Sequence, residues 1–140
     1  MRTTTQRWKI KNKNRLLLAF MKELAGDAQI SFEGDLQALG LLGLPGASTE
    51  ESNVLKRNTL WPRQDFVVLP LEAQAVGAVI AAIGGTISHA IIHIQIEKAG
   101  KLEFGAYDNF HPQSMFFGGA VTQSFLDSLV AEGILMPLVE

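Results

Sequence analysis

All three histidines of this chain and its single tyrosine lie between residues 87 and 111. His93, Glu103 and Tyr107 are the first candidates for chemistry, because an imidazole beside a carboxylate and a phenol can transfer protons or bind a small polar ligand. These side chains meet only if the chain places them on one face of a β-sheet. The alternative, which the sequence favours, is that they form the solvent-facing side of an antiparallel sheet.

A β-hairpin over about residues 87–110 would bring these side chains together. Apolar and polar residues alternate along residues 92–97 and again along residues 102–107, which is the period of a β-strand. The sequence therefore predicts a central hairpin with one apolar and one polar face.

The turn of this hairpin decides which residues face one another. A two-residue loop would set Ile96 against Glu103 and mix the two faces. A three-residue loop over residues 98–100, with its last residue in the left-handed region, pairs His93 with Gly105 instead. We therefore predict the three-residue loop, with open space above Gly105.

A second candidate site comprises His89, Asp108 and His111. A turn after Asn109 would fold His111 back toward His89, where these groups could act as acid and base or bind a metal. His89 and His93 alone do not form a metal site, because residues four apart in a strand are about 13 Å apart. We predict neither a metal nor a cofactor.

Other catalytic motifs are missing from the sequence. The absence of cysteine excludes disulfides, a thiol nucleophile and thiolate metal sites. There is no Gly-x-Ser-x-Gly nucleophile motif, and the glycine-rich stretch over residues 39–46 lacks the Gly-Lys-Ser/Thr of a phosphate loop.

Positive charge is concentrated near the N-terminus. Residues 1–15 contain half of the 12 basic residues and no acid, whereas the rest of the chain contains all 14 acids. A basic arm over residues 1–13 can bind phosphates, and its Trp8 can stack on a base. The alternative, which the sequence favours, is an arm that folds onto the acidic body or forms an edge strand. The nucleic-acid candidates are Arg7, Trp8, Lys9, Lys11 and Lys13.

Composition indicates one globular domain over residues 14–140. Apolar residues make up 47% of the 140-residue chain and charged residues 19%, which permits a sizeable core and is compatible with a homo-oligomer interface. Residues 73–96 lack Asp, Glu, Lys and Arg, but their pattern changes from helical to alternating after Gly84 and Gly85. We therefore predict a helix and a strand rather than a membrane span, in a cytoplasmic protein.

The predicted fold class is α+β: a small mixed, mostly antiparallel sheet packed by about three helices. Helical periodicity covers approximately residues 14–25, 71–83 and 121–132. A strand–helix–strand run would make the strand at residues 65–69 parallel to the first strand of the hairpin.

Residues 36–64 are the least regular part of the sequence. They form either a flap over a site or a loop whose leucines pack into the core. A capping box that begins at Ser48 predicts a short helix to about Arg57.

No complete catalytic constellation emerges, so we first expect a binding module whose partner is another protein, such as a regulator, inhibitor or immunity-type protein. The second hypothesis is a small enzyme or ligand-binding domain that uses His93, Glu103 and Tyr107. The third is nucleic-acid binding through the basic arm.

Overall fold

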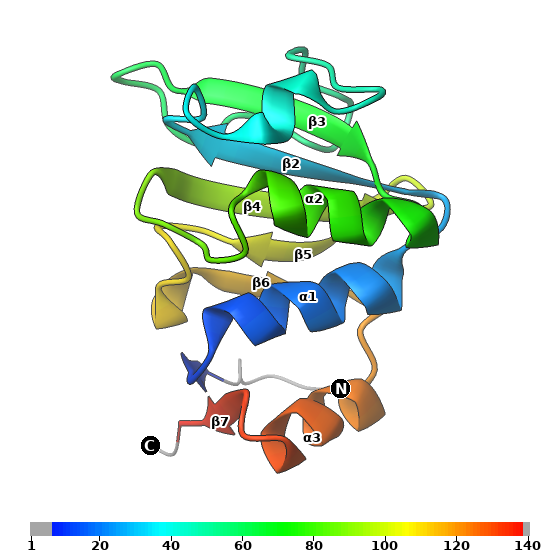
Figure 1. The fold of residues 1–140 in the computed structure, drawn as a ribbon. Coiled ribbons are helices and arrows are strands. Elements are labelled where there is room, and N and C mark those ends of the chain that lie inside the picture. Colours follow the sequence, from blue (N-terminus) through cyan, green and yellow to red (C-terminus); the bar gives the residue numbers. More distant parts are fainter. Residues whose placement is uncertain (1–6, 139–140) are drawn as a thin grey trace.

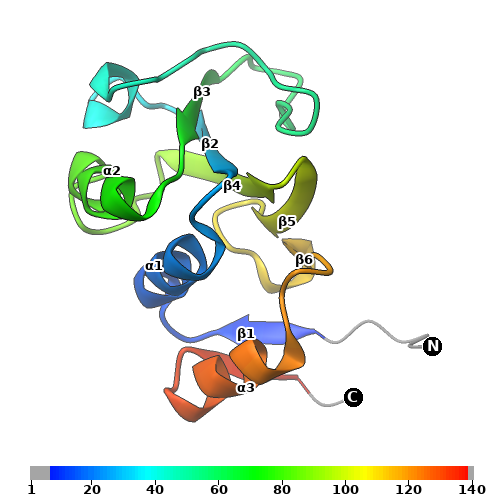
Figure 2. The ribbon, with the colours of Figure 1, turned by 90° about the vertical axis from the view of Figure 1, so that its right-hand side faces the viewer.

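Residues 7–138 are described by a computed structural model, in which a five-stranded sheet is packed by helices on one face (Figures 1 and 2). The strand order is β3-β2-β4-β5-β6, and every neighbouring pair is antiparallel. A separate two-stranded sheet joins β1 to β7. The described residues contain three α-helices, so the predicted α+β fold class is confirmed.

The elements follow one another along the chain with short connections, apart from one long irregular segment between β2 and β3. Single 3-10 turns occur at Gly40–Gly43, Ala73–Ala75 and Pro112–Ser114. The helices and strands are β1 (Trp8–Ile10), α1 (Lys13–Leu24), β2 (Ala28–Gly34), β3 (Asp65–Pro70), α2 (Val76–Ala82), β4 (Ile91–Lys98), β5 (Lys101–Ala106), β6 (Met115–Phe117), α3 (Gln123–Ala131) and β7 (Leu135–Pro137).

The apolar face of the sheet is covered by α1 and α2 (Figure 2). Helix α1 is capped at its N-terminus by Asn12, whose side chain accepts the backbone N–H of Arg15. Its buried Phe20 packs against Phe104 of β5 at 4.5 Å between ring centroids and against Phe117 of β6 at 5.0 Å. This aromatic cluster ties the helix to the β5–β6 side of the sheet.

Strands β3 and β4 run in the same direction, as the strand–helix–strand pattern predicts, but β2 lies between them. The chain leaves β3, passes through α2 over the apolar face, and returns one strand beyond β2 (Figure 1). This topology places β2 and β4 side by side at the centre of the sheet.

The predicted register of the hairpin is wrong. The turn between β4 and β5 has two central residues, Ala99 and Gly100, both with positive φ (52° and 81°). A β-bulge between the Glu97–Leu102 and Ile96–Phe104 pairs returns the apolar residues of both strands to one face. Gly105 therefore lies opposite Gln95 instead of His93. The bulge accommodates one extra residue, so the shorter loop does not mix the apolar and polar faces.

The polar face of the sheet is also buried, contrary to the predicted solvent-facing surface. Five of its polar residues on β2, β4 and β5 are at most 6% exposed: Ser31, Glu33, His93, Gln95 and Glu103. Gln29 and Glu97, nearer the hairpin turn, are partly exposed. The five buried residues are covered in part by residues 48–64, which we call the strap. Leu55 of the strap forms a second apolar cluster with Phe66 and Val68 of β3.

The strap forms no helix, so the predicted helix from Ser48 to about Arg57 is wrong. The backbone N–H and C=O of Ser48 both bond to Val68, which makes Ser48 an extension of the sheet rather than a helix cap. In the preceding loop, Leu36 and Leu41 are fully buried. These two leucines therefore pack into the core.

The beginning of the described chain is part of the fold. Strand β1 pairs with β7, and Trp8 is only 7% exposed, with its ring centroid 6.3 Å from that of Phe117. The first part of the predicted basic arm, residues 1–6, lies outside the described residues. Between residues 7 and 138, no helix has the length and apolar character needed to cross a membrane.

Candidate functional site

His93 and Tyr107 lie together on the strap-facing side of the sheet. Their ring centroids are 5.6 Å apart, and both side chains line an open hollow of about 340 Å³. The space above Gly105 is filled, because a Cβ atom there would lie 2.6 Å from Cε2 of the Tyr107 ring. Burial raises the pKa of the Tyr107 phenol above its ordinary value, so this group stays protonated at neutral pH.

Glu103 does not join His93 and Tyr107. Its carboxylate is buried at the other end of β5, where Oε1 accepts the backbone N–H of Ala120 at 2.9 Å. The same oxygen occupies the space that a Cβ atom on Gly118 would fill. Glu103 therefore holds the loop that follows β6.

The carboxylate opposite His93 is instead that of Glu33, which the sequence reasoning missed. Glu33 of β2 is the direct cross-strand partner of His93 of β4. It is 1% exposed and accepts the backbone N–H groups of Asn58 at 2.7 Å and Thr59 at 3.1 Å. The alternation of apolar Ile30 and Phe32 already places Glu33 on the polar face and could have identified it.

The hydrogen bonds of His93 define how its ring is protonated. The backbone N–H of Asp108 donates to Nδ1 at 3.1 Å, so Nδ1 carries no proton in this arrangement. Nε2 must then carry the proton and donate to the hydroxyl oxygen of Thr59 at 2.8 Å. Because both ring nitrogens are engaged, His93 joins two loops and cannot take the proton of Thr59 in this geometry.

A third polar group, Gln95, lies two residues after His93 on β4. We call Glu33, His93 and Gln95 the polar row. The Nε2 atom of Gln95 donates to the carbonyl oxygen of Lys56 at 3.1 Å, and its Oε1 accepts the N–H of the same residue at 3.4 Å. Within residues 7–138, every buried side-chain nitrogen and oxygen has a hydrogen-bond partner. Glu33, His93 and Gln95 therefore anchor strap residues 56–59 through satisfied hydrogen bonds.

Immediately after the anchored residues, the strap exposes two large apolar side chains. Leu60 is 93% exposed and Trp61 is 85% exposed. We call these two residues the strap tip. The tip is flanked by the cations Lys56, Arg57 and Arg63.

The second candidate site, His89, Asp108 and His111, is not assembled as a unit. All three residues are exposed, and their side chains share no hydrogen bond or ion pair. The turn around Asn109 does lie against the start of β4. The contact is made by Asn109 itself, whose side chain donates to the carbonyl oxygens of Ser88 and Ile91. Across the part of the chain that the structure describes, no three His, Asp or Glu side chains are grouped to hold a metal ion.

The nucleic-acid candidates are divided between the surface and the core. Arg7, Lys9 and Lys11 are exposed. The Nζ atom of Lys13 donates to Oδ1 of Asn109, and the burial of Trp8 prevents its ring from stacking on a base. An aromatic side chain that is open to a ligand is instead that of Trp61, on the strap, which is 85% exposed.

No protein-family model, curated protein or solved structure matches this chain. A function must therefore be inferred from the exposed and buried groups of the chain itself.

Proposed function

We propose that this chain is a binding module that recognises another protein through the strap tip, Leu60 and Trp61. The observation that carries the proposal is the exposure of these neighbouring side chains, 93% and 85%. Burying a large apolar side chain stabilises a complex by about 1.5–3 kcal/mol, and folding of this chain does not obtain that contribution. Trp is also among the residues that dominate the energy of protein interfaces.

The anchoring of the strap supports the proposal. The tip follows directly after residues 56–59, which Glu33, His93 and Gln95 hold by hydrogen bonds. A loop that is already ordered loses less conformational entropy when it binds. The buried polar residues Glu33, His93 and Gln95, of which only His93 belongs to the predicted catalytic cluster, then act as the support of a recognition loop.

The charge of the strap defines the chemistry of the partner. Residues 52–64 of the strap, which include the tip, contain Lys56, Arg57 and Arg63 and no acid, and the two acids of the strap, Glu50 and Glu51, lie near its start. The partner should therefore present an apolar recess surrounded by acidic residues. Attraction between these surfaces would accelerate association, and added salt would screen it.

The first test asks whether the tip binds a second copy of the chain. Sedimentation velocity of the full chain should show a monomer that the double variant Leu60→Ser/Trp61→Ser leaves unchanged. A dimer that this double variant dissociates would overturn the proposal of a different protein partner.

The second test identifies and measures the partner. A photoreactive amino acid at position 60 captures neighbouring proteins in cells, and the captured protein is then purified and titrated by calorimetry. We expect Trp61→Ala to weaken binding at least about 30-fold, corresponding to an interface residue worth 2 kcal/mol. Met136→Ser, which changes an exposed apolar residue of β7, is the matched control. Equal affinity of the Trp61→Ala variant and the unaltered chain would refute the proposal.

A further inference from the structure

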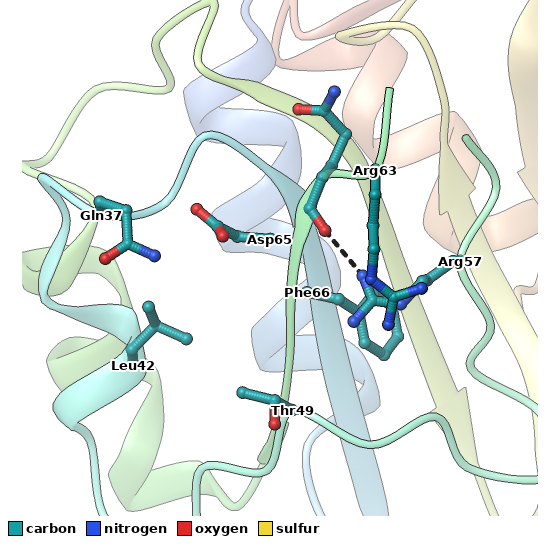
Figure 3. Close-up of a pocket in the computed structure, with 8 residues that line it drawn as sticks. Gln37, Leu42, Thr49, Arg57, Arg63, Asp65 and Phe66 are labelled. Carbon is teal, nitrogen blue, oxygen red and sulfur yellow. Dashed lines mark hydrogen bonds between the residues drawn. The ribbon is translucent and has the colours of Figure 1, made fainter. Parts of the chain in front are cut away.

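A pocket of about 270 Å³ lies beside the strap, between β3 and the loop that follows β2 (Figure 3). Its lining includes Phe66 of β3, Arg57, whose guanidinium lies over the Phe66 ring, and Arg63. Gln37 and Leu42 lie across the pocket from the arginines. The pocket is separate from the hollow at His93 and Tyr107, with which it shares no lining residue.

The two arginines of the pocket have no ion-pair partner among residues 7–138. Neither has a carboxylate within ion-pair distance among the described residues, and Arg63 makes no hydrogen bond to any of them. The pocket contains one acid, Asp65, whose Oδ2 accepts the backbone N–H of Leu36 at 3.0 Å. The lining therefore has a net charge of about +1, with the acid already hydrogen-bonded to the loop.

Arg57 is fixed in position before any ligand arrives. Its Nη1 donates to the carbonyl oxygen of Gln64 at 2.7 Å, and its guanidinium carbon lies 5.1 Å from the centroid of the Phe66 ring. A guanidinium has five N–H donors, so most of those of Arg57 remain available. The Thr49 hydroxyl and the Gln37 amide add neutral donors to the same pocket.

We infer that this pocket binds a phosphate group, as the free anion or as the end of a small phosphomonoester. A phosphomonoester has a charge of about −1.5 to −2 at neutral pH and three strong acceptor oxygens, which matches two guanidinium groups with neutral donors nearby. A carboxylate has one negative charge and two oxygens, and it would use fewer of these donors. The pocket shares Arg57 and Arg63 with the cations that flank the strap tip, but the inference does not require the proposed partner, and its test needs no partner.

The test is an NMR titration of the full chain with inorganic phosphate and, separately, with glycerol 3-phosphate at constant ionic strength. We expect saturable shifts of the amide signals of Gln37, Thr49 and Gln64. Tighter binding of glycerol 3-phosphate would identify an ester as the ligand, and equal binding would identify the free anion. Absence of saturable shifts with either compound would overturn the inference, and so would equally tight binding of acetate.

The decisive variant is Arg63→Gln, because Arg63 has no hydrogen bond within the described residues that its loss would disturb. It should weaken phosphate binding at least about tenfold, corresponding to the loss of one charge-assisted hydrogen bond. Lys22→Gln, which removes an exposed cation from α1, is the matched control and should leave binding unchanged. Equal losses in both variants would indicate attraction to the overall charge and would overturn the site.

Discussion

Glu33 and His93 face each other across the β2–β4 pair, and both bind the same residue of the strap. Glu33 accepts the backbone N–H of Thr59, while His93 contacts the hydroxyl of that residue. A buried carboxylate is costly to desolvate unless hydrogen bonds compensate it, and the strap supplies two backbone donors. The strap and the polar row therefore stabilise each other.

Glu33→Gln should loosen the strap. The neutral amide has only one acceptor oxygen, so one of the N–H groups of Asn58 and Thr59 loses its partner. We expect the free energy of unfolding to fall by about 1–3 kcal/mol. Denaturant titration measures this change, and amide hydrogen exchange should accelerate at residues 58 and 59. The control is Glu50→Gln, an exposed strap acid, and unchanged exchange in Glu33→Gln would contradict the anchoring role.

His93 should be protonated on Nε2 when its ring is neutral. The amide of Asp108 donates to Nδ1, which excludes a proton there. Long-range nitrogen-15 correlation spectra of the imidazole distinguish the two tautomers directly. The exposed His89 is the internal reference, for which a mixture of tautomers is expected. A proton on Nδ1 of His93 would show that the loop at Asp108 is held in another way.

The two tryptophans should behave in opposite ways. Trp8→Ala should lower the free energy of unfolding by about 3–5 kcal/mol, because it leaves a cavity beside Phe117. Trp61→Ala should change it by less than about 0.5 kcal/mol, because the ring is exposed. In Trp8→Phe and Trp61→Phe, acrylamide should quench the fluorescence of Trp61 and leave that of Trp8 protected. Strong destabilisation by Trp61→Ala would show that the tip packs against the chain.

Glu97 should make stability depend on pH. Burial, and secondarily the charge of Asp27, raises the pKa of Glu97. The folded chain therefore holds this proton more tightly than the unfolded chain does. The stabilising contribution is complete below the unfolded pKa of about 4.3 and is lost as the pH rises through the folded pKa.

Glu97→Gln should thus raise the free energy of unfolding at pH 7, by less than about 1 kcal/mol because the side chain is partly exposed. The difference from the unaltered chain should disappear near pH 3, and urea titrations at both pH values measure it. The exposed Glu23 of α1 provides the control substitution Glu23→Gln. A Glu97→Gln variant that is less stable than the unaltered chain at pH 7 would contradict the predicted rise in the free energy of unfolding.

Replacing Gly34 or Gly77 by alanine should have opposite effects on stability. A Cβ atom on Gly34 would lie 2.0 Å from the carbonyl oxygen of Ala90, so the backbone must move, at a cost of about 3 kcal/mol. Gly77 of α2 has open space around it, and Gly77→Ala should stabilise the helix by about 0.5–1 kcal/mol. Thermal unfolding of the two variants measures both effects. A stable Gly34→Ala variant would contradict the close approach of β2 to the segment before β4.

Local patterns in the sequence determined the elements and the faces of this fold. A period of two residues identifies the strands of the hairpin, and helical spacing identifies α1, α2 and α3. These patterns depend on neighbours within one or two turns of backbone, so they can be read without knowledge of the fold. For the same reason they place His93 and Tyr107 on one face.

Tertiary structure alone decided the register and what covers the polar face. A bulge shifts the pairing after Ile96, and simple alternation does not reveal which strand contains the extra residue. His93 meets Thr59 across 34 positions of the chain, and Glu33 meets Asn58 across 25. Alternation shows that a face is polar, but only the packing of a distant segment determines whether that face is solvated or buried. In this chain the strap buries it, and Glu33 rather than Glu103 becomes the carboxylate opposite His93.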